Sequence, residues 1–269
     1  MNRIDQPNLK ELFVLNKLFS LSGRTALVTG GSKGIGKAMA RAFAEAGADI
    51  AISARHEDEL QKAKAEIADG TNVRVEYFVA DMTQRDQVKK LAKDVLAKLG
   101  RVDVLVNNAG SNKPQNLVDT TEEVWDEILE LNLSSCNLLS HLLVPGMIER
   151  KWGRIIHLSS VMALASNPAR GLYSATKAAL IGMARAHALE LGPHGVTVNC
   201  IAPGPVATDL PMNLLSDEQK RSFAERTAVK RWGQPIDMVG PALLLATDAG
   251  AFVTGNVIVA DGGLLCRTF

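Results

Sequence analysis

Short apolar segments alternate with helix-like segments along most of this chain, and this alternation limits the possible folds more than any other feature. Strand-like segments occupy residues 24–30, 49–55, 73–81, 102–110, 153–160, 196–204 and 256–263. Several are apolar almost throughout, which is typical of strands that helices cover on both faces of a sheet. Strands that alternate with helices pair in parallel through right-handed crossovers. The sequence therefore predicts an α/β fold: one doubly wound domain with a seven-stranded parallel sheet and helices on both faces.

One domain of this kind accounts for most of the 269 residues. Residues 1–20 precede the first strand, and we expect an arm or a short helix there. Residues 21–269 would form the domain itself, in which the longest expected helix covers residues 121–151. Residues 206–235 separate the last two strands. We expect this long insertion to act as a substrate lid, because long segments at the carboxyl ends of strands often do so.

The composition points away from several classes of function. The formal net charge is +1, and 46% of the residues are hydrophobic and 22% charged, which gives no reason to expect a nucleic acid or a membrane surface as partner. No apolar run reaches the length of about 18 residues that spans a membrane. The three cysteines, Cys136, Cys200 and Cys266, form neither a CxxC motif nor a metal-type cluster. We therefore expect reduced thiols, no metal site and a cytoplasmic protein.

The glycine-rich segment TGGSKGIG, residues 29–36, joins the first expected strand to the first expected helix. Gly30, Gly34 and Gly36 permit positive φ angles and close approach of the backbone to a pyrophosphate, and the first N–H groups of the helix attract the anion. A glycine triplet alone is a weak signal. Here it lies in the first strand–turn–helix unit, which is the context that a dinucleotide site requires. The sequence therefore predicts a Rossmann domain that binds a dinucleotide.

The end of the second strand indicates which dinucleotide is bound. NAD sites usually have an acid there that grips the ribose 2′-hydroxyl, but this strand ends in Ser-Ala-Arg, with Arg55 last. Arg55 and Lys33 can pair with a 2′-phosphate, which favours NADP(H) over NAD(H). The alternative is a solvated Arg55, with Glu57 or Asp58 holding the ribose. Asp81, which ends the third strand, is either an acceptor for the adenine amino group or a turn residue.

A tyrosine and a lysine lie four residues apart in YSATK, residues 173–177, within an expected helix. Positions i and i+4 share one face of a helix. A free tyrosine, with a pKa of about 10, exchanges protons poorly near neutral pH, whereas a neighbouring ammonium favours the phenolate. An isolated pair of this kind is most often a surface lysine beside a half-buried tyrosine. Its interpretation as a proton-transfer pair depends on the rest of the chain.

Five motifs together resemble the short-chain dehydrogenase/reductase family. They are TGGSKGIG, NNAG at residues 107–110, a serine thirteen residues before the tyrosine, YSATK, and the Pro-Gly pair at residues 203–204. They occur in the family's order and extend over nearly the whole chain. The tyrosine–lysine spacing is similar to that of the ordinary branch of the family. It differs from the divergent enoyl reductases, in which these two residues lie further apart.

The resemblance implies a role for each motif residue. Tyr173 would be the acid/base, Lys177 its partner, Ser160 a hydrogen-bond donor to the substrate oxygen, and Asn132 the helix residue that holds a proton-relaying water. The implied cofactor-binding residues are Gly30, Ser32, Lys33, Gly34, Ile35, Gly36, Arg55, Asp81, Met82, Asn108, Ala109, Gly110, Tyr173, Lys177, Pro203, Gly204, Val206 and Thr208. The cofactor would perform hydride transfer, while the protein supplies orientation and a proton.

Two polar residues beside these motifs are weaker candidates. Ser159 competes with Ser160, but the thirteen-residue spacing and the alternation of the strand favour Ser160. His157 could be proposed as a base, yet it points to the opposite face from its strand neighbours. We expect His157 to be a buried histidine with satisfied hydrogen bonds.

The resemblance implies interconversion of a ketone and a secondary alcohol with NADP(H), and it leaves the substrate open. LFSLSGRTALVTGG and AGSNKP are similar to gluconate 5-dehydrogenase-like members, which act on sugar acids. The whole motif set is equally similar to 3-oxoacyl-[acyl-carrier-protein] reductases. Leu210, Met212, Leu214 and Leu215 in the expected lid favour a moderately apolar ketone.

A non-catalytic NADP-binding sensor or scaffold is the alternative from another class, since a fold does not fix a function. Such proteins typically lose part of the catalytic set, whereas all four candidates are present here. The resemblance also implies a homotetramer, and the apolar residues within 127–143 and 179–191 and the last strand are consistent with it.

Overall fold

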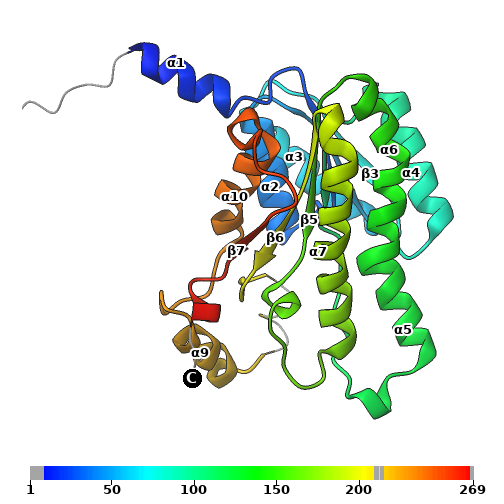
Figure 1. Ribbon diagram of the computed structural model, residues 1–269, viewed down its shortest axis with the longest axis vertical. Coiled ribbons are helices and arrows are strands. Elements are labelled where there is room, and N and C mark those ends of the chain that lie inside the picture. Colours follow the sequence, from blue (N-terminus) through cyan, green and yellow to red (C-terminus); the bar gives the residue numbers. More distant parts are fainter. Residues whose placement is uncertain (1–8, 209–211, 213–214, 267–269) are drawn as a thin grey trace, which may run out of the picture.

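A seven-stranded parallel sheet forms the centre of the computed structural model, which describes residues 9–208, 212 and 215–266 (Figure 1). The strands run in the spatial order β3-β2-β1-β4-β5-β6-β7, and each neighbouring pair is parallel. Their bounds are β1 Thr25–Thr29, β2 Asp49–Ala54, β3 Val75–Val79, β4 Val104–Asn107, β5 Gly153–Leu158, β6 Val196–Pro203 and β7 Val257–Ala260. The predicted fold class and all seven expected strands are confirmed.

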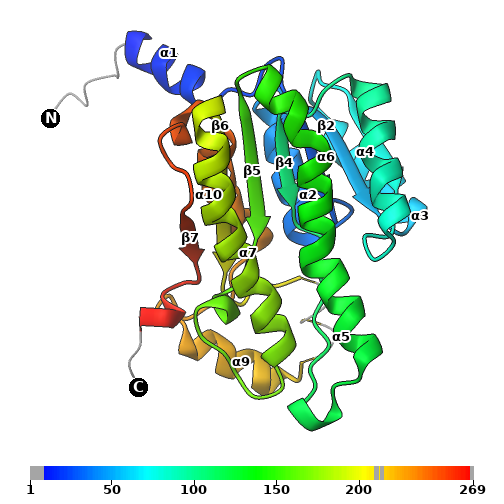
Figure 2. The ribbon, with the colours of Figure 1, turned by 45° about the vertical axis from the view of Figure 1, so that its right-hand side comes forward.

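Helices cover both faces of this sheet (Figure 2). One face packs against α2 (Gly34–Glu45), α3 (Glu57–Ala68) and α10 (Val239–Ala246). The other packs against α4 (Arg85–Leu99), α6 (Ser135–Glu149) and α7 (Gly171–Leu191). The sequence analysis does not predict α10, because its apolar residues extend around the helix and leave no periodic pattern. Short 3₁₀ helices are η1 Leu117–Asp119, η3 Val161–Ala163, η4 Gly192–His194, η5 Pro235–Met238, η6 Asp248–Gly250 and η7 Leu264–Cys266.

The alternation of side chains along each strand explains why the strands read as continuous apolar runs. In β1, Ala26 and Val28 join the core beneath α2, α3 and α10, whereas Leu27 joins the core beneath α4, α6 and α7. Successive side chains of a strand point to opposite faces, so a strand buried on both faces needs apolar residues at every position. All three side chains are fully buried.

The long helix expected over residues 121–151 is divided into three parts. A regular segment, α5 (Glu122–Leu129), is followed by a π-helical turn, η2 (Glu130–Ser134), and then by α6. Residues 122–149 are thus helical without a break, as expected, but the helix contains a π turn that was not expected. Asn132 lies in the π turn, and π turns inside helices occur frequently at functional sites.

The order of the strands places a crevice at the carboxyl ends of β1 and β4. The chain runs from β1 outward to β2 and β3, then returns to the other side of β1 and continues through β4 to β7. In open α/β sheets, ligands bind outside the carboxyl ends of the strands at such a switch point. The loops that follow β1, β4, β5 and β6 therefore enclose the candidate site.

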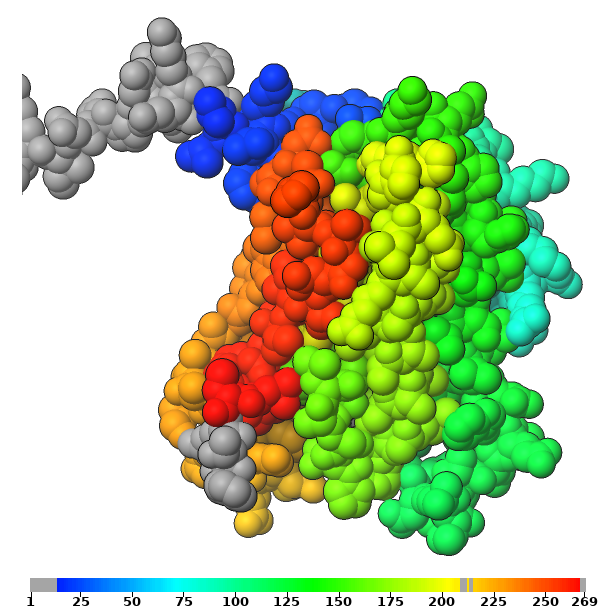
Figure 3. Space-filling view, viewed as in Figure 1, coloured from blue at the N-terminus to red at the C-terminus, as the bar shows by residue number. Residues whose placement is uncertain are grey.

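The insertion between β6 and β7 lies at this end of the sheet, and α1 (Leu9–Leu18) lies at the opposite end of the molecule (Figures 1 and 3). Val206 bridges to Gly233 at the root of the insertion. Helix α9 (Asp217–Arg226) begins with a capping box at Ser216. Of the apolar lid residues, Leu210 and Leu214 lie outside the described residues. No helix in the described part of the chain is long and apolar enough to cross a membrane.

Candidate active site

Hydrogen bonds from the loop after β4 fix the glycine loop after β1. The side-chain amide of Asn108 donates to the carbonyl oxygens of Thr29 at 2.8 Å and Gly30 at 3.1 Å. In return, the hydroxyl oxygen of Thr29 accepts from the backbone N–H groups of Asn108 at 3.1 Å and Ala109 at 3.0 Å. The two expected cofactor-binding segments therefore form one rigid edge of the crevice.

The glycine loop has the shape that a pyrophosphate needs. Gly30 and Gly34 adopt positive φ angles of 64° and 56°, which favour glycine. A Cβ atom at Gly36 would overlap the carbonyl oxygen of Gly30, so only glycine allows the helix to approach the loop this closely. Lys33, at the N-cap of α2, makes no side-chain cap, and the first turn contains no acid. The first N–H groups of α2 are therefore suited to an anion.

The neighbourhood expected for a 2′-phosphate contains an acid that the sequence analysis missed. Glu59 pairs with the ammonium of Lys33 at 2.9 Å and accepts from the hydroxyl of Ser32 at 3.2 Å. The hydrogen bond from Lys33 is the main cause that lowers the pKa of the Glu59 carboxyl. Arg55 is exposed nearby on the chain, at the end of β2. The one signal for Glu59 in the sequence is its place in the first turn of α3, four residues after Arg55.

Asp81, the expected acceptor for the adenine amino group, lies just after β3, and two further expected cofactor-binding residues are Met82 beside it and Ile35 in α2. One carboxylate oxygen of Asp81 accepts from the backbone N–H and the hydroxyl of Thr83, both at 2.9 Å. Asp81 therefore shapes a turn, which leaves its second oxygen available to an amino group. Met82 is buried, and Ile35 is partly buried against the core. These two side chains support the loops from behind.

Lys177 and Tyr173 lie on one face of α7 beside the loop after β4. The ammonium of Lys177 lies 5.7 Å from the ring centre of Tyr173 and donates to the carbonyl oxygen of Leu158 at 2.6 Å. Lys177 is only 4% exposed. A Cβ at Gly110 would lie 3.3 Å from that ammonium and 3.1 Å from the side-chain oxygen of Asn132. Because residue 110 carries no side chain, the loop, the π turn and α7 converge at this point.

Asn132 joins the same three elements through hydrogen bonds. Its side-chain oxygen accepts from the backbone N–H of Ser111 at 3.0 Å, and its amide donates to the carbonyl oxygen of Ser111 at 2.9 Å. The amide also donates to the hydroxyl of Thr176 at 3.2 Å. Asn132 is fully buried. Its side chain therefore clamps the loop after β4 onto α7, a role that the sequence analysis did not predict.

The two serines that end β5 have different partners. The hydroxyl of Ser159 donates to the carbonyl oxygen of Lys177 at 2.8 Å, which ties β5 to the helix. The hydroxyl oxygen of Ser160 accepts from the N–H of Met162 at 3.1 Å. Within the described part of the chain, the Ser160 hydroxyl hydrogen has no acceptor and is available to a ligand. This arrangement supports Ser160, rather than Ser159, as a donor to substrate.

Separate alanine variants of these serines should have different effects. We expect Ser160→Ala to lower kcat by about a hundredfold, since it removes a donor to developing charge, and to lower the free energy of unfolding by about 1 kcal/mol, since it also removes the cap of η3 at Met162. We expect Ser159→Ala to lower the free energy of unfolding by about 1 kcal/mol, because a buried hydrogen bond is lost, with a much smaller change in kcat. Steady-state kinetics and urea unfolding of both variants check this. The reverse pattern would assign the catalytic hydroxyl to Ser159.

His157 is fully buried, but its hydrogen bonds are only partly satisfied, so the expectation of full satisfaction is wrong. Its Nδ1 atom lies 3.1 Å from the amide nitrogen of Asn107. In the described part of the chain, its Nε2 atom and the side-chain oxygen of Asn107 have no partner. Burial is the main cause that lowers the pKa of His157 to about 3, with contributions from His187 and Lys177. A neutral imidazole in the interior has a structural role.

This buried imidazole predicts a loss of stability on mild acidification. A histidine in the unfolded chain has a pKa of about 6.5, so the unfolded chain binds a proton below that pH. In the folded protein, His157 stays neutral until the pH falls to about 3. The contribution of His157 to the free energy of unfolding is fully present well above pH 6.5 and is lost as the pH falls below it. We expect it to be about 1.4 kcal/mol smaller at pH 5.5 than at pH 7.5. Urea unfolding at both pH values measures the loss. His157→Gln should reduce it, and an equal loss in that variant would contradict the assignment.

The end of β6 and the root of the insertion close the crevice opposite the glycine loop. A Cβ at Gly204 would lie 2.7 Å from the Cα of Asp261, so β6 packs directly on the turn after β7. Asp261 holds that turn by accepting from the N–H groups of Gly263 and Leu265, both at 2.8 Å. The methyl group of Thr208 would lie 3.1 Å from a Cβ at Gly34. Three of the expected nicotinamide-side residues, Pro203, Gly204 and Val206, belong to this wall.

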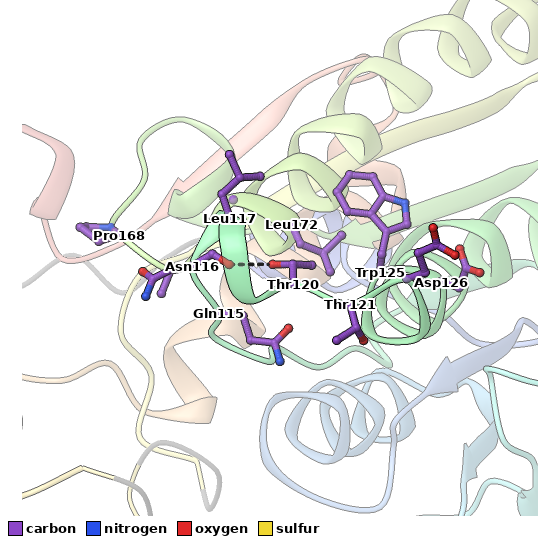
Figure 4. Close-up of a pocket in the computed structure, with 12 residues that line it drawn as sticks. Gln115, Asn116, Leu117, Thr120, Thr121, Trp125, Asp126, Pro168 and Leu172 are labelled. Atoms are coloured by element: carbon purple, nitrogen blue, oxygen red, sulfur yellow. Dashed lines mark hydrogen bonds between the residues drawn. The ribbon is translucent and has the colours of Figure 1, made fainter.

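A cavity of about 600 Å³ lies between the loop after β4 and the start of α7 (Figure 4). The backbone N–H of Gln115 donates to the carbonyl oxygen of Ala169 and joins the two walls at 3.1 Å. The side chains of Leu117, Trp125 and Leu172 make much of the lining apolar. Leu172 directly precedes Tyr173 in α7, but none of the four catalytic candidates lines the cavity. Among the described residues, no group of His, Cys, Asp or Glu side chains could hold a metal ion.

A doubly wound sheet with a glycine loop and a tyrosine–lysine pair at its carboxyl edge defines a class of dinucleotide-dependent oxidoreductases. A family model described as enoyl-(acyl carrier protein) reductase matches residues 30–265. The chain belongs to the short-chain dehydrogenase/reductase family. The description of the family model does not fix the reaction, because the relatives that match over the same region are named for other reactions.

Three relatives illustrate this range. A 3-oxoacyl-[acyl-carrier-protein] reductase of Thermotoga maritima is 38% identical over 246 residues, which are 91% of this chain and 99% of the relative. The structure of a gluconate 5-dehydrogenase from Burkholderia cenocepacia, in complex with NADP and tartrate, is similar with a TM-score of 0.88 and 32% identity, over 94% of this chain and 100% of that one. The structure of a 3-oxoacyl (acyl-carrier-protein) reductase from Agrobacterium tumefaciens with NADP bound has a TM-score of 0.88 and 32% identity, over 93% and 97%.

Proposed function

We propose that this protein is an NADP(H)-dependent oxidoreductase that interconverts a ketone and a secondary alcohol. The observation that carries the proposal is the position of the Lys177 ammonium. It lies beside the ring of Tyr173 and against Gly110, on a loop that is hydrogen-bonded to the glycine loop. One edge of the sheet thus carries a phenol, an ammonium and a phosphate-binding loop. These groups are suited to proton transfer beside a bound dinucleotide.

The proposed roles follow from these contacts. A bound nicotinamide would supply or accept the hydride at the substrate carbon. Tyr173 gives a proton to the carbonyl oxygen during reduction and removes it during oxidation. The positive charge of Lys177 stabilises the negative charge that forms on the phenol oxygen. Ser160 donates a hydrogen bond to the substrate oxygen, and Asn132 holds the loop after β4 and α7 in register.

The residues of the crevice fit a dinucleotide. The glycine loop and the N-terminus of α2 accommodate the pyrophosphate, because Gly34 and Gly36 leave the backbone accessible there. Asn108, Ala109 and Gly110 would hold the ribose that carries the nicotinamide. Arg55 and Lys33 select the 2′-phosphate, and related structures that contain NADP support NADP(H) as the cofactor.

We infer that the substrate is a 3-oxoacyl thioester or a keto sugar acid and that it binds in the cavity at the start of α7, whose chemistry favours the thioester. Leu117, Trp125 and Leu172 offer an apolar surface, and Glu122 and Asp126 also line the cavity. Two carboxylates repel an anionic sugar acid, whereas an uncharged acyl chain gains from burial against the apolar side chains. The lid residues 206–235 would close over this substrate.

Fluorescence titration with NADPH and NADH, followed by a panel of ketones, tests the proposal. The panel contains 5-ketogluconate, an acetoacetyl thioester and an aryl diketone. We expect preference for NADPH and turnover of the acetoacetyl thioester. Turnover of 5-ketogluconate alone would assign the sugar acid instead. Tight binding of NADPH without turnover of any ketone would contradict the enzymatic proposal in favour of a non-catalytic sensor.

We also propose that the protein is a cytoplasmic homotetramer. Leu189 on α7, Phe252 after η6 and Val259 on β7 are exposed apolar residues, and such residues are suited to interfaces between subunits. Cys136 and Cys200 are buried free thiols, which is consistent with a reducing compartment. Light scattering of the purified protein should give the mass of four subunits, and the mass of a monomer would contradict the proposal.

A further inference from the structure

The glycine loop has an acidic partner at the place where a 2′-phosphate is expected. Glu59 uses both of its carboxylate oxygens there: one pairs with the ammonium of Lys33 at 2.9 Å, and the other accepts from the hydroxyl of Ser32 at 3.2 Å. These are two of the donors that a phosphate on the ribose would need. The carboxylate therefore already occupies part of the proposed phosphate site.

The other charged groups nearby do not share this position. Glu57 accepts a hydrogen bond from the Tyr77 hydroxyl at 2.9 Å and is thereby directed towards β3. In the described part of the chain, Arg55 makes no ion pair, so its guanidinium is available to a phosphate. The first turn of α2 contains no acid. Of the acids in the first turn of α3, Glu59 is the one that faces the loop.

We propose that Glu59 is a specificity-determining residue that weakens the preference for NADP(H) over NAD(H). The inference rests on the proposed function. The 2′-phosphate of NADP(H) must displace the Glu59 carboxylate from Ser32 and Lys33, and it then remains close to a like charge. NAD(H) has a neutral 2′-hydroxyl at the same place, which can donate a hydrogen bond to that carboxylate. Glu59 therefore lowers the affinity for NADP(H) and leaves the affinity for NAD(H) nearly unchanged.

Because Lys33 and Glu59 are partly exposed, Glu59 reduces the affinity for NADP(H) without abolishing it. The side chains of Lys33 and Glu59 are 54% and 32% exposed, and ion pairs at such positions are weak. A phosphate can therefore displace Glu59, with Arg55 and Lys33 as its partners. The carboxylate changes the ratio of the two affinities and does not exclude NADP(H).

Glu59→Gln tests the inference, because glutamine keeps the size and the hydrogen-bonding capacity of the side chain and removes its charge. We expect the Kd for NADPH to fall about tenfold, as the loss of one nearby like charge implies, and the Kd for NADH to change less than about twofold. Adenosine 2′,5′-bisphosphate should bind the variant more tightly in the same proportion. Adenosine 5′-monophosphate, which lacks the 2′-phosphate, should bind equally to both proteins.

Glu66→Gln is the matched control. Glu66 pairs with Lys37 at 2.6 Å across the same two helices, so this variant removes the same charge about two helical turns further along α3 than Glu59. We expect its affinities to equal those of the unmodified protein. Equal tightening by both variants would show a general charge effect and overturn the inference.

The outcomes separate the inference from the proposed function. An unmodified protein that prefers NADPH and reduces a ketone, with no change of the affinity ratio in Glu59→Gln, overturns the inference alone. An unmodified protein that binds neither NADPH nor NADH overturns the proposed function and the inference with it.

Discussion

Replacement of Tyr173 by phenylalanine is expected to lower kcat for ketone reduction by about a thousandfold or more, while the affinity for NADPH changes little. The change removes one hydroxyl from a half-buried ring and no contact that the ring makes with α7. A general acid contributes typically 10²- to 10⁴-fold to a rate, and its loss acts on kcat rather than on binding. Single-turnover reduction of the preferred ketone and fluorescence titration with NADPH measure the two quantities separately.

The chain contains a natural control for this experiment. Tyr77 is the only other tyrosine in the sequence, and its hydroxyl donates to Glu57 on the outer surface at 2.9 Å. Tyr77→Phe removes the same atom from β3, away from Tyr173 and Lys177, and should leave kcat unchanged. Turnover by Tyr173→Phe at more than a tenth of the normal rate would contradict the role of the phenol. A parallel loss of NADPH affinity would indicate that the ring positions the cofactor instead.

The parts of the fold that follow from local pattern could be predicted from the sequence. Strands covered on both faces are apolar at most positions, so β1 and β4 are visible as nearly continuous apolar runs. The π turn at Asn132 was not predictable: an asparagine is unusual inside a helix, but no local pattern distinguishes a π turn from a regular helical turn. Helix α10 was missed for a related reason: it is apolar on most sides and has no amphipathic period.

The candidate site, too, could be predicted from the sequence only in part. The sequence identifies Tyr173 and Lys177 because a phenol and an ammonium lie four residues apart in an expected helix. The structure places both beside the loop after β4. Glu59 and the clamp made by Asn132 depend on contacts between segments that are distant in the sequence. Ion pairs and hydrogen bonds of that kind are decided by tertiary packing, and no local pattern marks them. The sequence therefore predicts the chemical groups of the site better than their partners.

Replacement of Gly36 by alanine is expected to disrupt both the fold and the cofactor site. A Cβ there would overlap the carbonyl oxygen of Gly30 and lie 2.5 Å from the side-chain nitrogen of Asn108. Neither group can move freely, because Asn108 is hydrogen-bonded to Thr29 and Gly30. Helix α2 would have to move away from the loop, and the bonds that fix the loop would weaken. We expect the free energy of unfolding to fall by about 3 kcal/mol and the Kd for NADPH to rise at least tenfold.

Gly240→Ala controls for the general effect of adding a methyl group to a helical glycine. Gly240 lies in α10 on the surface, and nothing lies within 4 Å of the position that its Cβ would take. Alanine favours a helix over glycine by up to about 1 kcal/mol, whereas Pro241 disfavours a helical conformation for a preceding residue with a Cβ, so this variant should change the free energy of unfolding by less than about 1 kcal/mol. Urea unfolding and NADPH titration of both variants measure the difference. If Gly36→Ala unfolded at the same urea concentration as Gly240→Ala and bound NADPH normally, α2 would not need glycine for its close approach to the loop.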